Sequence, residues 1–252
     1  MTELSQGGDP FRHHPELARL IRPAAQSFFR TMAPSDLDAT MARQGHGPEW
    51  RYPDAVREEM RHAVLAGHRG RDLWVFAYGS LMWDPGIEFA EVRQAHVAGH
   101  CRKMCLVDRS GGRGDEERPG LMAGLDRGGS CHGLVFRIAA EQVEVESEVV
   151  WRREMIAPCY RAVFIPVHTA QGTVEALAFE ADNSTDMIET DLCYDLQVRY
   201  LATGQGMLGT SMEYVDNLLE HFETLGIDDA ALAKLAADAR QYRADHPSEV
   251  PA

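Results

Sequence analysis

Residues 73–81, LWVFAYGSL, contain an apolar run that is followed at once by a Gly-Ser turn. The run over residues 73–77 is typical of a buried β-strand. Glycine adopts backbone angles that other residues avoid, so another molecule can approach the main chain closely at Gly79. Consecutive N–H groups in such a turn bind carboxylates and developing oxyanions. Because Gly and Ser also end many strands that have no function, a second residue must support this interpretation.

Composition limits the classes of partner. The chain has 252 residues and a net charge of −14. This length suits one ordinary domain with an extension, or two small domains. The acidic balance argues against nucleic acid and anionic membranes as partners, since both require a basic surface. No apolar run has membrane-spanning length and the N-terminus does not resemble a secretory signal, so we expect a cytoplasmic protein.

The cysteines and histidines do not predict a metal site or a disulfide framework. Five cysteines are widely spaced, and only Cys101 and Cys105 lie close together in the sequence. No second Cys or His pair completes a zinc set with them. His96 and His100 have metalloprotease spacing, but Val97 stands where the catalytic Glu would be. We therefore expect no bound metal.

The chain divides into an N-terminal helical extension (residues 1–71), a main domain (residues 72–245) and a short tail (residues 246–252). In the extension, helical periodicity predicts one helix between residues 17 and 28, and start signals predict others over 37–43 and 54–66. The main domain begins with strands and ends with helices. Strands are expected at 73–77, 89–97, 103–107, 121–125, 133–138, 160–167 and 174–180, with hairpin turns at Gly128 and Gly172. Helices are expected at 141–153, 184–201, 212–225 and 228–242. This order indicates an α+β fold whose largely antiparallel sheet can close into a small β-barrel with peripheral helices.

Glu154 is the second residue that supports a functional turn. Val143, Ser147 and Val150 share one face of the expected helix, and a further step of four reaches Glu154. Burial and the partial negative charge at a helix C-terminus both raise the pKa of a carboxyl group. A carboxyl group of that kind can accept and donate a proton near neutral pH. The alternative is a structural ion pair with one of three nearby arginines: Arg152, Arg153 or Arg161.

Four segments resemble, in the same order, motifs of the ChaC-type γ-glutamylcyclotransferases. They are WVFAYGSLMW at residues 74–83, RG…PG at 113–120, RREM at 152–155 and EYVDN at 213–217. The resemblance covers about residues 72–226, and the N-terminal helices also resemble those of bacterial members. It implies a γ-glutamylcyclotransferase-like fold and a lyase reaction that releases 5-oxoproline from a γ-glutamyl compound. For this branch it implies glutathione as substrate and cysteinylglycine as the other product, with no cofactor or metal.

The resemblance also implies roles for individual residues. Glu154 corresponds to the catalytic acid/base. The γ-glutamyl-binding loop corresponds to Val75, Phe76, Ala77, Tyr78, Gly79, Ser80 and Leu81. Further substrate-binding candidates are Arg102, Tyr160 and Tyr214, and either Arg102 or Arg113 is a candidate partner for the glycyl carboxylate. Packing roles stay open for Tyr78 and Tyr214, and a solvated position stays open for either arginine.

The sequence departs from the family pattern beside Glu154. The family often has Gly-Gly-Tyr there, whereas this chain has Ala157-Pro158-Cys159-Tyr160, which makes the local backbone stiffer. Ala77 also stands where the family usually has Gly. The departure bears on substrate choice more than on reaction type.

Two other functions remain open. One is the same cyclisation on another γ-glutamyl amine or amino acid. The other is a non-enzymatic regulatory binding protein, because the family name has been attached to cation-transport regulation. Hydrolysis with a serine nucleophile is disfavoured, since no Gly-x-Ser-x-Gly motif surrounds Ser80. We expect a monomer or weak dimer.

Overall fold

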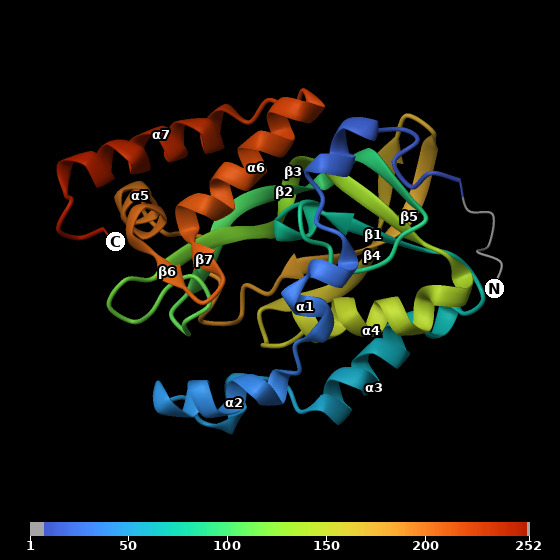
Figure 1. Ribbon diagram of the computed structural model, residues 1–252, viewed down its shortest axis with the longest axis horizontal. Helices are drawn as coiled ribbons and strands as arrows, with labels where there is room; N and C mark the ends of the chain where they lie inside the picture. The colour runs from blue at the N-terminus through green and yellow to red at the C-terminus, as the bar shows by residue number, and fades with distance from the viewer. Residues whose placement is uncertain (1–7, 251–252) are drawn as a thin grey trace.

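Five strands close into a barrel at the centre of the computed structural model, which describes residues 8–250 (Figure 1). The strand order is β1-β3-β2-β4-β5. Neighbours pair antiparallel, and parallel pairing of β5 with β1 and β3 completes the closure. The predicted largely antiparallel barrel is therefore confirmed. The strands are β1 (Leu73–Ala77), β2 (Glu91–Asp108), β3 (Gly120–Ile138), β4 (Tyr160–Thr169) and β5 (Gly172–Ala181).

Helices flank the barrel on two sides (Figure 1). One group comprises α1 (Phe28–Thr31), α2 (Pro34–Arg43), α3 (Asp54–Leu65) and α4 (Val143–Glu154). The other comprises α5 (Tyr194–Thr203), α6 (Ser211–Leu225) and α7 (Ala230–Asp245), together with a small hairpin of β6 (Gln205–Gly206) and β7 (Gly209–Thr210). Single 3₁₀ turns are η1 (Pro15–Arg19), η2 (Ala24–Gln26), η3 (Pro48–Trp50), η4 (Ala66–His68), η5 (Ser80–Met82) and η6 (Ala140–Gln142). None of the helices between residues 8 and 250 has the length and apolar character needed to cross a membrane.

Strand β1 is buried on both faces. Val75 and Ala77 belong to the core cluster that includes residues of α4 and α6. Phe76 points to the opposite side, into a second cluster with Val135 and Ile165. Burial on both faces explains why the strand is a continuous apolar run rather than an alternating one. Packing on both faces therefore fixes the position of β1, and with it the start of the Gly79-Ser80 turn.

The hairpin predicted at Gly128 is wrong. Residues 120–138 form one strand, β3, which pairs with β2 along its length. Gly128 and Gly129 have positive φ angles of 100° and 65°, and Gly99 on the partner strand has 82°. The register shifts between Ala98 and His100. These glycines produce a bulge that bends both strands, and a bulge and a hairpin turn use the same backbone conformation. For the same reason β2 is one strand rather than the predicted two.

One predicted helix is wrong and another is confirmed only over its second half, whereas the others lie within a few residues of their expected positions. The helix expected over residues 17–28 is replaced by η1, η2 and the short α1, because Pro23 interrupts it. The helix expected from residue 184 begins only at Tyr194. Before it, residues 187–189 hydrogen-bond to the backbone of β2, so they cannot be helical.

Two arginines dock the segment before β1 onto α4. Arg61 of α3 is 2% exposed, donates to Ser147 Oγ at 2.8 Å and pairs with Glu144 at 2.6 Å. Arg30 binds the buried Glu146 with both guanidinium Nη atoms, at 2.6 and 2.9 Å. These contacts fix helix α4 to the segment before β1.

Replacing Arg61 with Met should lower the free energy of unfolding by about 2 kcal/mol, measured by urea denaturation. The value is below the cost of breaking a fully buried pair because Glu144 is largely exposed. Arg69→Met, at an exposed position just after α3, should be close to wild type. Equal stability of the two variants would contradict the docking role of Arg61.

Candidate active site

The turn after β1 presents unpaired backbone N–H groups. Gly79 precedes η5, and a Cβ atom at this position would lie 2.5 Å from the hydroxyl of Tyr214 on α6. The space that glycine leaves at position 79 is thus occupied by the hydroxyl of Tyr214. Among the hydrogen bonds within residues 8–250, none is donated by the N–H groups of Gly79, Ser80 or Leu81. These groups are available to a bound molecule.

Glu154 is the last residue of α4, and its side chain is 12% exposed. Ser147 and Val150, on the same face, are fully buried. Burial raises the pKa of Glu154, while the charge and hydrogen bond of Arg153, 2.8 Å away, lower it; burial is the larger effect. The carboxyl group is therefore ion-paired with Arg153 and also has a raised pKa, and its role as an acid/base stays a prediction.

Arg153 connects Glu154 to the turn. Its guanidinium donates to Ser80 Oγ at 2.7 Å and to the backbone oxygen of Asp84, and it pairs with Glu154 through Nε. The side chain is 4% exposed, and it stacks on Phe29 with 4.0 Å between the guanidinium carbon and the ring centroid. Sequence reasoning treated Arg153 only as one of three possible ion partners. Its position next to Glu154 in the sequence indicates the ion pair between them, whereas the hydrogen bond to Ser80 depends on tertiary structure.

Three buried tyrosine hydroxyl groups are affected by the charge of Glu154: those of Tyr78, Tyr160 and Tyr214. Burial is the main reason why the pKa values of Tyr78 and Tyr160 lie well above the usual value, and why that of Tyr214 is about 12. The charge of Glu154 also raises the pKa of all three hydroxyl groups, by less than burial does. Tyr78 donates a hydrogen bond to the backbone oxygen of Phe179 at 2.8 Å, so its hydroxyl also has a packing role.

A cavity of about 710 Å³ opens beside the turn. Ser80, Arg113 and Arg153 line it. Glu154 is not part of its lining and contacts the cavity wall through Arg153. The side chains of the other loop residues, each at most 5% exposed, belong to the core, so only their backbone can contact a ligand: Val75, Phe76, Ala77 and Leu81.

Arg102 lies outside this cavity. Its guanidinium donates to the backbone oxygen of Tyr78 at 2.8 Å, pairs with Asp229 at 3.3 Å and lies over the ring of Phe222. Arg102 therefore stabilises the backbone at the end of β1 and does not face the cavity. The structure does not bring Arg102 together with Ser80 and Arg153.

Arg113 does line the cavity. It is 8% exposed, donates to the backbone oxygen of Thr210 at 2.8 Å and lies 5.3 Å over the ring of Tyr214. No carboxylate of residues 8–250 forms an ion pair with it, and burial lowers its pKa. A buried cation without an acidic partner favours an anionic ligand. Of the two arginines offered by the sequence, the geometry favours Arg113.

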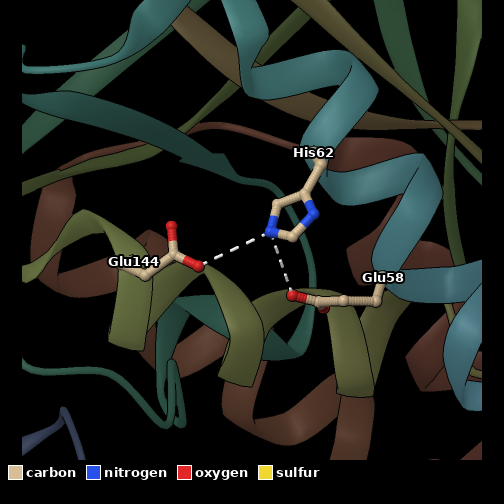
Figure 2. A group of neighbouring side chains, drawn as sticks. All are labelled: Glu58, His62 and Glu144. Atoms are coloured by element: carbon tan, nitrogen blue, oxygen red, sulfur yellow. Dashed lines mark ion pairs between the residues drawn. The ribbon is translucent and has the colours of Figure 1, made fainter.

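One group of side chains has the spacing of a metal site. Single ligand atoms of Glu58, His62 and Glu144 lie within 4.8 Å of one another (Figure 2). Arg61 Nη2 lies 2.6 Å from Glu144 and 3.0 Å from His62, and it also binds Glu58. The guanidinium thus takes the place that a cation would occupy. His100, which the sequence placed in a second possible pair, binds Glu180 instead.

Comparisons with known proteins identify the family of the chain. The sequence profile of the family described as ChaC-like protein matches residues 73–242. The glutathione-specific γ-glutamylcyclotransferase of Escherichia coli is 33% identical over 175 residues, which cover 69% of this chain and 75% of that protein. Glutathione-specific γ-glutamylcyclotransferase 1 of Danio rerio is 28% identical over 181 residues, which cover 69% and 91%.

A solved structure shows the same fold. The crystal structure of the yeast γ-glutamyl cyclotransferase specific to glutathione aligns with a TM-score of 0.61 at 18% identity. The alignment covers 70% of this chain and 99% of the yeast chain. With the profile match over residues 73–242, it follows that this chain is a member of the ChaC-like protein family.

Proposed function

We propose that this chain is a glutathione-specific γ-glutamylcyclotransferase, which converts glutathione to 5-oxoproline and cysteinylglycine. The E. coli relative that carries this name matches 69% of the chain. The observation that carries the proposal is the bridge made by Arg153, which joins Ser80 in the turn to the buried Glu154. A binding protein that does no chemistry has no need for a buried carboxyl group with a raised pKa beside a ligand-binding turn.

The reaction needs little more than positioning and one proton carrier. The α-amino group and the γ-carbonyl belong to the same substrate molecule, so holding the folded conformer makes the attack intramolecular. Glu154, ionised, accepts a proton from the α-ammonium. The amine nitrogen then bonds to the γ-carbonyl carbon, and the bond from that carbon to the cysteinyl nitrogen breaks. Glu154 returns that proton to the leaving nitrogen. It then accepts the second proton, which the attacking nitrogen loses to become the lactam N–H, and passes it to the amino group of cysteinylglycine, which leaves as an ammonium, so atoms and charge balance.

The turn and Arg113 supply the electrostatic part of the site. The N–H groups of residues 79–81 face the γ-carbonyl oxygen, where negative charge develops. Arg113, which the sequence offered for the glycyl carboxylate, is assigned here to the α-carboxylate instead; it lines the same cavity as Ser80. Ser80 Oγ accepts a hydrogen bond from Arg153, which suits an anchoring role, and the mechanism requires no covalent intermediate.

Replacing Glu154 with Gln should lower kcat for glutathione by roughly 10²-fold or more, because the acid/base is lost while the shape is kept. Release of cysteinylglycine and 5-oxoproline measures turnover. Glu148→Gln, at an exposed position on the same helix, is the matched control and should stay near wild type. Turnover of both variants within about twofold of wild type would remove Glu154 from the mechanism.

The pH profile gives a second test of Glu154. Ionised Glu154 is the active form, and burial raises its pKa above the usual 4.5, so kcat/KM should fall on the acid side at a pH above that value. The residual activity of Glu154→Gln should lack this limb, since an amide does not titrate. Circular dichroism must show that the protein stays folded over the acid part of the pH range. An acid limb at or below pH 4.5 would contradict a raised pKa.

The turn is tested by Gly79→Ala. The added methyl group would lie 2.5 Å from the hydroxyl of Tyr214, which is 2% exposed and cannot swing away. We expect kcat/KM to fall roughly 10–100-fold as the turn shifts. Gly67→Ala, at a position with open space around it, should have no effect. In a Tyr214→Phe background the Gly79→Ala change should cost less; an equal cost would exclude the steric explanation.

A further inference from the structure

The extension before β1 forms one wall of the cavity. Arg22, Phe28 and Phe29 line it together with Ser80 and Arg153. These extension residues precede the segment matched by the family profile, residues 73–242. Helix α1, which begins at Phe28, packs on α4 near its end at Glu154 (Figure 1). The extension therefore takes part in the site and is not only an attached segment.

Arg22 lies where the cavity meets solvent, and part of its guanidinium has no hydrogen-bond partner among residues 8–250. Its backbone N–H donates to Trp83 at 2.7 Å, and its Nη1 donates to Asp84 at 2.6 Å. Asp84 is 3% exposed, whereas the Arg22 side chain is 49% exposed. A guanidinium has five N–H donors, and within residues 8–250 the Asp84 contact is the one side-chain hydrogen bond that Arg22 makes. It can bind a second carboxylate while it keeps the first.

Charge limits where a second substrate carboxylate can bind. Glutathione carries an α-carboxylate and a glycyl carboxylate. Arg153 is already bound to Ser80, Asp84 and Glu154, and Arg113 pairs with the α-carboxylate in the proposed function. The wall that α6 contributes is acidic and would repel a carboxylate; it carries Glu213, Asp216 and Glu220. Arg22 is the remaining cation among the lining residues of this cavity.

We propose that Arg22 binds the glycyl carboxylate of glutathione, so that the extension makes the site specific for the tripeptide. This inference rests on the proposed function. The γ-glutamyl end binds at the turn and Arg113, and the leaving dipeptide extends along the cavity toward the rim. γ-Glutamylcysteine, which lacks the glycyl residue, then has no group that reaches Arg22.

The test compares two substrates in three variants. Arg22→Gln should raise KM for glutathione on the order of tenfold, the usual effect of losing a charged hydrogen bond. The kcat/KM for γ-glutamylcysteine should change less than about twofold. Arg22→Lys should restore part of the loss. Arg19→Gln, an exposed arginine of the same extension, is the matched control for charge. Binding of both compounds by calorimetry and the melting temperature complete the comparison.

The outcomes distinguish a role of Arg22 in substrate specificity from a role in docking the extension. Equal losses on both substrates with a lower melting temperature would show that Arg22 only docks the extension, and no loss on either would place the glycyl carboxylate elsewhere. Both results overturn the proposal. If the wild-type protein turned over neither substrate, the proposed function would fail, and calorimetry would still decide whether Arg22 discriminates between the two compounds.

Discussion

The guanidinium of Arg153 is the contact on which the arrangement of the site depends. It binds Ser80 Oγ at 2.7 Å and Glu154 at 2.8 Å, and it stacks on Phe29. One side chain thus joins the turn after β1, the end of α4 and the N-terminal extension. Because it is 4% exposed, these contacts are made where water cannot compete for them. The catalytic proposal requires the turn and Glu154 to keep a fixed separation, and Arg153 fixes it.

Two opposing effects act on Glu154, and their balance matters for chemistry. The neighbouring cation alone would lower its pKa and leave a weak base, whereas burial raises the pKa and outweighs the cation. Local charges matter also because the chain carries a net charge of −14 and does not attract an anionic substrate at long range. Arg113 and Arg22 provide positive charge at two points of the cavity besides Arg153, whose guanidinium is already bound to Ser80, Asp84 and Glu154; the other charged lining residues are acidic.

Sequence patterns predicted the parts of the fold that depend on local chemistry. Residues 73–77 are a strand as predicted, because an apolar run that is buried on both faces has few alternatives. The helical spacing of Val143, Ser147 and Val150 placed Glu154 on the buried face of its helix, because residues four apart share a face. Gly128 misled the prediction because its backbone angle serves both a bulge and a hairpin. The choice between Arg102 and Arg113 could not be made from sequence, since it depends on which carbonyl groups the folded chain brings to each guanidinium.

The most direct test of the account is a crystal structure of the Glu154→Gln protein with glutathione bound. The γ-carbonyl oxygen should face the N–H groups of residues 79–81, with the α-amino nitrogen within hydrogen-bond reach of residue 154. That arrangement would show that Arg153 positions the turn and the acid for one reaction. A γ-glutamyl unit bound with its amino group turned toward the acidic wall of α6, away from residue 154, would contradict the account.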